Sequence, residues 1–140
     1  MIYTANYDSP MGRILLASRE HALIGLWFTD QKYFLGSLKG PMEQKTDEPA
    51  LCAAQIWLDR YFAGEKPEIS ELRLAPEGSV FRKAVWEILC QIPYGETMTY
   101  GEIARQTAAQ FDREHMSAQA VGGAIGHNPI SVIIPCHRVV

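Results

Sequence analysis

Short runs of apolar and β-branched residues, divided by polar turns, open the chain. They cover residues 2–7, 13–18 and 22–28, with Ser-Pro-Met-Gly between the first two and Arg-Glu-His between the last two. Runs of this length between turn-forming residues are typical of strands that pair with their neighbours in sequence. The pattern therefore predicts an antiparallel meander. Residues 29–46 are mixed and contain two glycines and a proline, so a loop is expected there.

A helical spacing of apolar residues replaces this pattern after residue 46. The residues that share one helix face are Leu51, Ala54, Leu58, Tyr61 and Phe62. Asp47 is the expected N-cap, Pro49 suits the first turn, and Gly64 suits the end. The stretch predicts an amphipathic helix whose aromatic side chains pack in the core. No pattern in residues 1–72 suggests chemistry.

Three further helices are predicted in the second half of the chain. Ser79, Thr99 and Ser117 can each cap one, and the glutamate three residues after Thr99 gives the pattern of a capping box. The apolar stripe of the first helix consists of Val80, Phe81, Ala84, Val85, Ile88, Leu89 and Ile92. The second is expected to end near Ala104, before a loop over residues 109–116. This arrangement is typical of a winged helix-turn-helix domain that binds DNA.

The third of these helices, expected from Ala118 to about Gly126, is built mostly of small residues. They are Ala118, Ala120, Gly122, Gly123, Ala124 and Gly126. So many glycines lower helix propensity, and their presence needs a reason. One explanation is close packing against another helix. The other is a smooth surface that enters the minor groove of DNA and reads it with little sequence preference.

An apolar run over residues 130–134 leads into Pro135 and then directly into Cys136, His137 and Arg138. The β-branched residues predict a buried strand that ends at the proline, which puts the thiol at the edge of a core. A cysteine next to a histidine is usually a small buried apolar residue beside a surface imidazole. However, a thiolate is the reactive form of cysteine, and neighbouring bases and cations favour it. Cys136 is therefore a candidate nucleophile.

Composition and charge narrow the possible functions. The 140 residues are 47% apolar, enough for one or two small domains, and a linker over residues 73–78 predicts domains 1–75 and 76–140. No apolar run approaches the roughly 20 residues of a membrane span, and the first residues lack the features of a signal peptide. The net charge is −3, and residues 77–140 hold five Lys and Arg against six Asp and Glu. Any DNA binding should therefore be weak and only modestly dependent on salt.

The cysteines and histidines do not form a metal-binding pattern. Cys52, Cys90 and Cys136 are an odd number without Cys-x-x-Cys spacing, and the four histidines show no ligand spacing. This argues against a disulfide framework or a zinc cluster. We expect reduced thiols, a cytoplasmic location and no metal.

The last stretch, Asn-Pro-Ile-Ser-Val-Ile-Ile-Pro-Cys-His-Arg-Val over residues 128–139, resembles the active-site signature of the methylated-DNA–protein-cysteine methyltransferases. Similar matches are Ile-Pro-Tyr-Gly at 92–95, Thr-Tyr-Gly-x-Ile-Ala at 99–104 and Ala-Val-Gly-Gly-Ala at 120–124. The resemblance covers essentially the whole chain and is dense from residue 76 onward. It implies an α/β N-terminal domain with an RNase H-like sheet, and a mainly α C-terminal winged helix-turn-helix domain.

The resemblance also implies a suicidal alkyl transfer in DNA repair by direct reversal. Cys136 would take a methyl or alkyl group from O6 of guanine, with O4 of thymine as a second candidate, and each molecule would react once without a cofactor. His137 would take the thiol proton through a water molecule. Tyr100 would help to rotate the nucleotide out of the duplex, Asn128 would brace the turn before the cysteine, and Val139 would line the base pocket.

The partner implied is double-stranded DNA that contains alkylated guanine, bound by a monomer away from membranes. The residues implied as DNA contacts are Ser117, Ala118, Gln119, Ala120, Gly122, Gly123 and Arg138. The family usually has an arginine at the position of Gln119, which enters the base stack. Glutamine can fill that space, but it lacks the charge and the stacking plane.

A second departure is that the family continues beyond the cysteine motif, with a glutamate that orients the histidine, whereas this sequence ends at Val140. We expect a chain that ends there to fold marginally and to transfer alkyl groups slowly. The alternative function is a non-catalytic DNA-binding module that recognises alkylated guanine. Cys136 favours the methyltransferase, and the missing segment favours the module. A cysteine hydrolase is a weaker third possibility.

Overall fold

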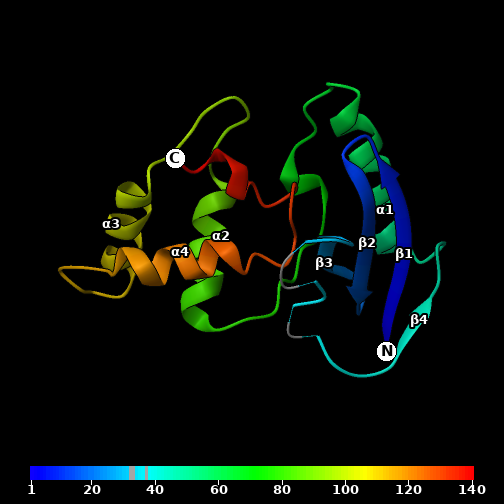
Figure 1. The fold of residues 1–140 in the computed structure, drawn as a ribbon, viewed down its shortest axis with the longest axis horizontal. Coiled ribbons are helices and arrows are strands. Elements are labelled where there is room, and N and C mark those ends of the chain that lie inside the picture. Colours follow the sequence, from blue (N-terminus) through cyan, green and yellow to red (C-terminus); the bar gives the residue numbers. More distant parts are fainter. Residues whose placement is uncertain (32–33, 37) are drawn as a thin grey trace. The chain divides into compact units, whose positions relative to one another are not determined.

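The computed structural model describes residues 1–31, 34–36 and 38–140, which divide into two units (Figure 1). Unit 1 holds residues 1–76 and 129–131, and unit 2 holds residues 77–128 and 132–140.

The apolar runs at the start of the chain form the sheet of unit 1. Strands β1 (Ile2–Ser9), β2 (Gly12–Arg19) and β3 (Ala22–Phe28) pair as the predicted antiparallel meander. A short strand, β4 (Met42–Gln44), pairs in parallel with β1, so the order is β3-β2-β1-β4. The prediction of a loop over residues 29–46 is wrong for β4, and it also includes residues 32, 33 and 37, which lie outside the described residues. All three residues of β4 are exposed, so no apolar pattern marked the strand.

Helix α1 (Pro49–Phe62) covers one face of this sheet and contacts β1, β2 and β3 (Figure 1). Its buried residues are Leu51, Ala54, Trp57 and Leu58, close to the predicted face. In the second half of α1 the indole of Trp57 donates a hydrogen bond of 2.8 Å to the carbonyl of Glu68. That contact attaches the short 3-10 helix η1 (Ile69–Glu71) to α1.

The N-cap of α1 is Glu48, and the prediction of Asp47 is wrong. The buried Glu48 carboxylate accepts hydrogen bonds from the Ser18 hydroxyl at 2.7 Å and from the Leu51 amide at 3.2 Å. It also lies 3.3 Å from Nδ1 of His21. Ser18 and His21 belong to β2 and the turn after it, so the choice of cap depends on tertiary contacts that a local pattern does not contain.

Burial alone would raise the pKa of Glu48, because it penalises a charged carboxylate. Hydrogen bonds from Ser18, Leu51, His21 and Ala50 outweigh that effect and lower the pKa below its ordinary value. The ionised carboxylate therefore stabilises the junction between the sheet and α1.

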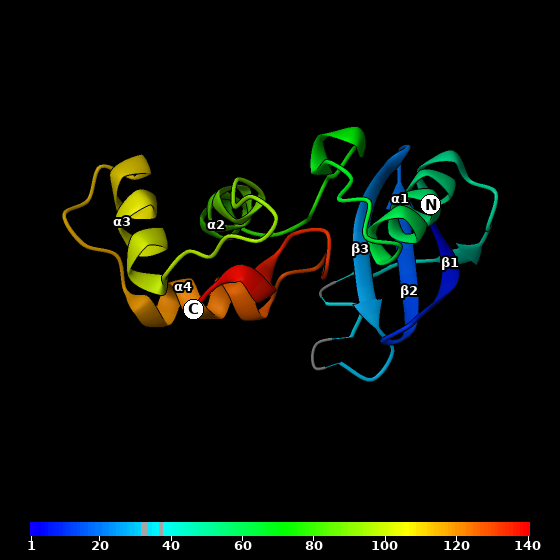
Figure 2. The same ribbon diagram turned by 90° about the horizontal axis from the view of Figure 1, so that it is seen from above.

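Unit 2 contains helices α2 (Val80–Cys90), α3 (Tyr100–Gln110) and α4 (Ala118–Gly126), and α4 crosses α2 steeply in Figures 1 and 2. The three predicted caps, Ser79, Thr99 and Ser117, each accept a hydrogen bond from an amide in the first turn of their helix. The contact between α2 and α4 includes a buried hydrogen bond of 2.8 Å from the Trp86 indole to the Ala124 carbonyl.

Two details of the helix predictions are wrong. Helix α3 continues to Gln110 instead of ending near Ala104, because Thr107 and Ala108 are buried and extend its inner face. Val80, which the stripe placed in the core, is 75% exposed in the first turn of α2.

The predicted strand over residues 130–134 does not form. Ile130 makes a single parallel bridge with Leu26, through amide hydrogen bonds of 2.8 and 3.1 Å that flank it. The chain then turns, because Val132 has a left-handed backbone with φ of 71°. Ile133 and Ile134 are nevertheless buried. The apolar run thus indicated burial correctly and conformation incorrectly.

Within the described ranges, no helix is both long and apolar enough to cross a membrane.

We predict that Glu48→Gln destabilises the protein by about 1–3 kcal/mol at pH 7, the usual effect of disturbing a buried hydrogen-bonded group. The lowered pKa means that this contribution is complete above about pH 4.3, the unfolded value, and is lost as the pH falls through the folded value. Urea unfolding from pH 3 to 8 measures it. The exposed Glu43→Gln is the control, and equal stability of the two variants at pH 7 would contradict the prediction.

Candidate active site

Cys136 opens the 3-10 helix η2 (Cys136–Arg138), directly after three buried residues, Ile133, Ile134 and Pro135. Its amide donates to the Ile134 carbonyl at 2.8 Å, and its carbonyl accepts from the Val139 amide at 3.3 Å. The thiol is partly exposed. The chain therefore presents this sulfur at the edge of the core of unit 2, as predicted, although a turn rather than a strand does so.

The side chain of Asn128 fixes the approach to this turn. Asn128 is only 5% exposed, and its Nδ2 donates a hydrogen bond of 2.8 Å to the carbonyl of Ile134, two residues before the cysteine. Its backbone amide donates to the Ile125 carbonyl at the end of α4. Asn128 thus connects the end of α4 to the turn that holds Cys136.

Backbone pairing brings the start of α3 to the other side of η2. The Met98 amide donates to the Arg138 carbonyl at 2.9 Å, and the Val140 amide donates to the Met98 carbonyl at 3.0 Å. The Tyr100 amide then donates to the Val140 carbonyl at 3.3 Å. Tyr100, whose side chain is part of the surface at 41% exposure, is therefore held next to the chain that follows Cys136.

The guanidinium of Arg138 contacts other residues of unit 2. Nη1 donates a hydrogen bond of 2.7 Å to the Ile92 carbonyl, and the group lies 5.3 Å from the centre of the Tyr94 ring. These contacts tie η2 to the segment after α2. The resemblance implied that Arg138 contacts DNA. In the structure its guanidinium contacts Ile92 and Tyr94 of the same unit.

His137 is exposed next to Cys136. Partial burial of its ring and then the nearby charge of Arg138 lower the pKa of the imidazole below 6.5. The neutral ring, which can accept a proton, is therefore the dominant form at neutral pH.

The other two thiols lie in different surroundings. Burial and then the charge of Glu87 raise the pKa of Cys90 to about 11. Cys52 donates a long hydrogen bond of 3.5 Å to the Thr46 carbonyl in unit 1. Neither lies in a turn like that of Cys136.

Helix α4 presents an uncharged face of small residues. It buries Val121, Ala124 and Ile125, and the exposed or half-exposed residues are Ser117, Ala118, Gln119, Ala120, Gly122, Gly123 and Gly126. In the part of the chain that the structure describes, a Cβ atom added at any of the three glycines would meet nothing within 4 Å beyond its chain neighbours and the nearby backbone of α4 itself. Close helix packing therefore does not explain these glycines.

Sequence profiles of one family match both halves of the chain. The profile "6-O-methylguanine DNA methyltransferase, ribonuclease-like domain" matches residues 2–76, and "6-O-methylguanine DNA methyltransferase, DNA binding domain" matches residues 80–140. The chain belongs to the 6-O-methylguanine-DNA methyltransferase family.

Individual members of the 6-O-methylguanine-DNA methyltransferase family are similar over nearly the whole chain. The methylated-DNA–protein-cysteine methyltransferase of Haemophilus influenzae is 39% identical over 99% of this chain and 73% of its own length. That of Methanosarcina acetivorans is 41% identical, over 99% and 83%. Among solved structures, Mycobacterium tuberculosis OGT in complex with DNA is 38% identical, with a TM-score of 0.81 over 99% of this chain and 78% of its own.

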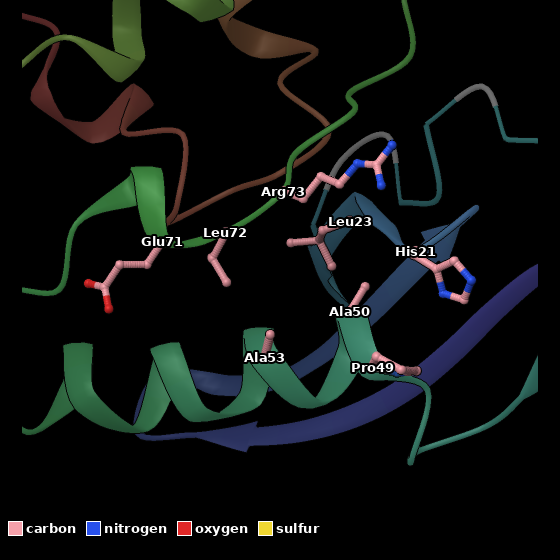
Figure 3. Close-up of a pocket in the computed structure, with 8 residues that line it drawn as sticks. All are labelled: His21, Leu23, Pro49, Ala50, Ala53, Glu71, Leu72 and Arg73. Carbon is pink, nitrogen blue, oxygen red and sulfur yellow. The ribbon is translucent and has the colours of Figure 1, made fainter.

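Two surface hollows had no signal in the sequence, because residues distant in the chain form each of them. A hollow of about 240 Å³ in unit 1 lies between the start of α1 and the segment after η1 (Figure 3). Figure 3 shows an apolar floor that includes Leu23, Ala53 and Leu72, whereas the Glu71 side chain points away. No cysteine lines it, so it offers this methyltransferase no alkyl acceptor. The second hollow lies in unit 2, beside the start of α4.

The difference between the thiols predicts their order of reactivity. At pH 7.5 the Cys90 thiol, with a pKa of about 11, holds roughly 300-fold less thiolate than it would at the ordinary value near 8.5, so Cys90 should react slowest with iodoacetamide. Peptide mass spectrometry of the native protein measures this, and labelling in urea, where all three thiols should react alike, is the control. Equal labelling of Cys90 and Cys136 in the native protein would contradict it.

Proposed function

We propose that this chain repairs alkylated DNA by direct reversal, and that Cys136 is the acceptor of the methyl or alkyl group from O6 of guanine. The observation that carries the proposal is the position of Cys136 in a turn fixed by Asn128 on one side and by the Met98–Val140 pairing on the other. The relatives are named for transfer to a protein cysteine, and one of them has been solved with DNA.

The chemistry needs one displacement. The Cys136 thiolate attacks the alkyl carbon in line with the bond to O6, so a carbon–sulfur bond forms as the carbon–oxygen bond breaks. The electron pair of the broken bond stays on the guanine, which takes up one proton. His137, neutral at the working pH, accepts the thiol proton through a water molecule, and the Tyr100 phenol would donate a proton toward the base.

Access to O6 requires that the nucleotide leaves the base stack, because that atom is buried in the duplex. The smooth, uncharged face of α4 suits insertion into the minor groove. Tyr100 would press on the phosphate of the extruded nucleotide, and Val139 would line its pocket. Arg138 would hold the turn through Ile92 and could reach DNA only with its remaining N–H groups.

The product is a thioether, and nothing in this reaction regenerates the thiol. Each molecule would therefore act once, as a monomer on duplex DNA containing alkylated guanine, without a cofactor or a metal. The three unpaired cysteines support a location in the reducing cytoplasm.

We predict that Cys136→Ser abolishes alkyl transfer and leaves DNA binding largely intact, because the hydroxyl is a far weaker nucleophile of similar size. Cys52→Ser and Cys90→Ser serve as matched controls and should keep transfer. Mass spectrometry after incubation with a duplex containing O6-methylguanine gives both the mass gain and the modified peptide.

An alkyl group on Cys52 or Cys90 would contradict the assignment of the acceptor. Tight binding of the methylated duplex with no mass gain on any residue would instead support a module that recognises the lesion without repairing it.

We also predict a shallow dependence of DNA affinity on salt, because few cations are available to unit 2. Gln119→Arg should tighten binding and increase the slope of log affinity against log salt by about 0.9, the value for one added phosphate contact. Fluorescence anisotropy between 50 and 200 mM salt measures the slope, with Gln91→Arg at the exposed end of α2 as the control. Slower repair by Gln119→Arg would contradict the proposed position of this residue.

A further inference from the structure

A hollow of about 310 Å³ lies beside the first turn of α4. Its lining residues are Phe81, Phe111, Arg113, Met116 and Ala120. The rings of Phe81 and Phe111 contact each other, with centroids 6.2 Å apart, and form its apolar part. Arg113 and Ala120 therefore face the same space, although one belongs to the loop before α4 and the other to α4 itself.

In the loop between α3 and α4, the positive side chain and the two negative ones lie in different places. It contains Asp112, Arg113 and Glu114 in succession, and only the arginine lines the hollow. The Arg113 amide donates to the Ala108 carbonyl at 2.9 Å, and Asp112 has a left-handed backbone with φ of 54°. The loop is thus folded back on the end of α3, with its single cation on the side of α4. Figures 1 and 2 show this loop projecting outward before it enters α4.

Arg113 provides a positive charge beside α4, which has no charged residue of its own. The exposed face of α4 has no ionised side chain, and phosphate neutralisation supplies most non-specific DNA affinity. Arg113 is exposed, and among the described residues its guanidinium has no ion pair or hydrogen bond of its own. Arg138, by contrast, is bound to the Ile92 carbonyl. A guanidinium can bind a phosphate with two parallel hydrogen bonds.

We propose that Arg113 binds a phosphate of the DNA strand that flanks α4, and so supplies from the loop the charge that Gln119 does not supply from the helix. This inference rests on the proposed function, since it requires α4 to lie against DNA. The stem of Arg113 stays against the apolar hollow, and its charged end reaches the backbone of the duplex. Such a contact carries no sequence information and positions the duplex for repair.

The test uses the full chain with Arg113→Gln, Arg113→Lys and, as the matched control, Lys83→Gln. Lys83 is exposed on α2, does not line the hollow, and its substitution removes the same charge from unit 2. Affinity for duplex DNA is measured by anisotropy at several salt concentrations, and single-turnover transfer is measured at limiting and saturating protein. Thermal melting of each variant checks that the fold is unchanged.

For Arg113→Gln we expect weaker binding and a slope of log affinity against log salt reduced by about 0.9. The ratio of wild-type to variant affinity should then fall about 3.5-fold between 50 and 200 mM salt. The rate at limiting protein should fall and the rate at saturating protein should not, while Arg113→Lys should keep the wild-type slope.

An unchanged slope in Arg113→Gln, or an equal loss in Lys83→Gln, would overturn the inference while wild-type binding and transfer leave the proposed function intact. Failure of the wild-type chain itself to bind duplex DNA would overturn both.

Discussion

The buried hydrogen bond from Nδ2 of Asn128 to the carbonyl of Ile134 holds the turn that carries Cys136. Residues 131–138 form neither a strand nor an α-helix, so they lack the repeated backbone bonds that stabilise regular structure. A turn of this kind depends on contacts from elsewhere in the chain. Backbone bonds from Arg138 and Val140 to Met98 and the bond from the Arg138 guanidinium to Ile92 also hold the turn, and like the Asn128 bond they come from unit 2. The sulfur is therefore positioned by the helical framework of the unit rather than by its own segment.

Features that depend on a few neighbouring residues could be predicted from the sequence. The helix caps at Ser79, Thr99 and Ser117 are local, because the hydroxyl bonds an amide three residues later. The cap at Glu48 could not be predicted in this way, since its choice depends on Ser18, thirty residues earlier. Strand β4 is held by backbone bonds to β1 and has no apolar side to reveal it. In each failure a tertiary contact outweighed a local preference.

In the candidate site, too, local features could be predicted from the sequence and features set by packing could not. The motif around Cys136 was enough to propose a nucleophile and a neighbouring base, since those residues are adjacent in the chain. It could not indicate that Arg138 turns toward Ile92 and Tyr94, because a side-chain direction depends on the packing of the whole unit. The hollow beside α4 combines side chains thirty or more residues apart, such as Phe81 and Phe111, so no local sequence pattern could predict it.

The glycines of α4 have a cost that the fold does not require. Each glycine in a helix interior is about 0.8–1 kcal/mol less favourable than alanine, so Gly122 and Gly123 together forgo about 2 kcal/mol of stability. Because an alanine Cβ at either position would meet open space, the fold itself would tolerate the exchange. The helix is thus kept weaker than its environment permits, which is the pattern of a trade-off between stability and activity. Natural selection for a thin helix, rather than for a strong one, would account for a protein that gives up folding free energy at the surface that we propose lies against DNA.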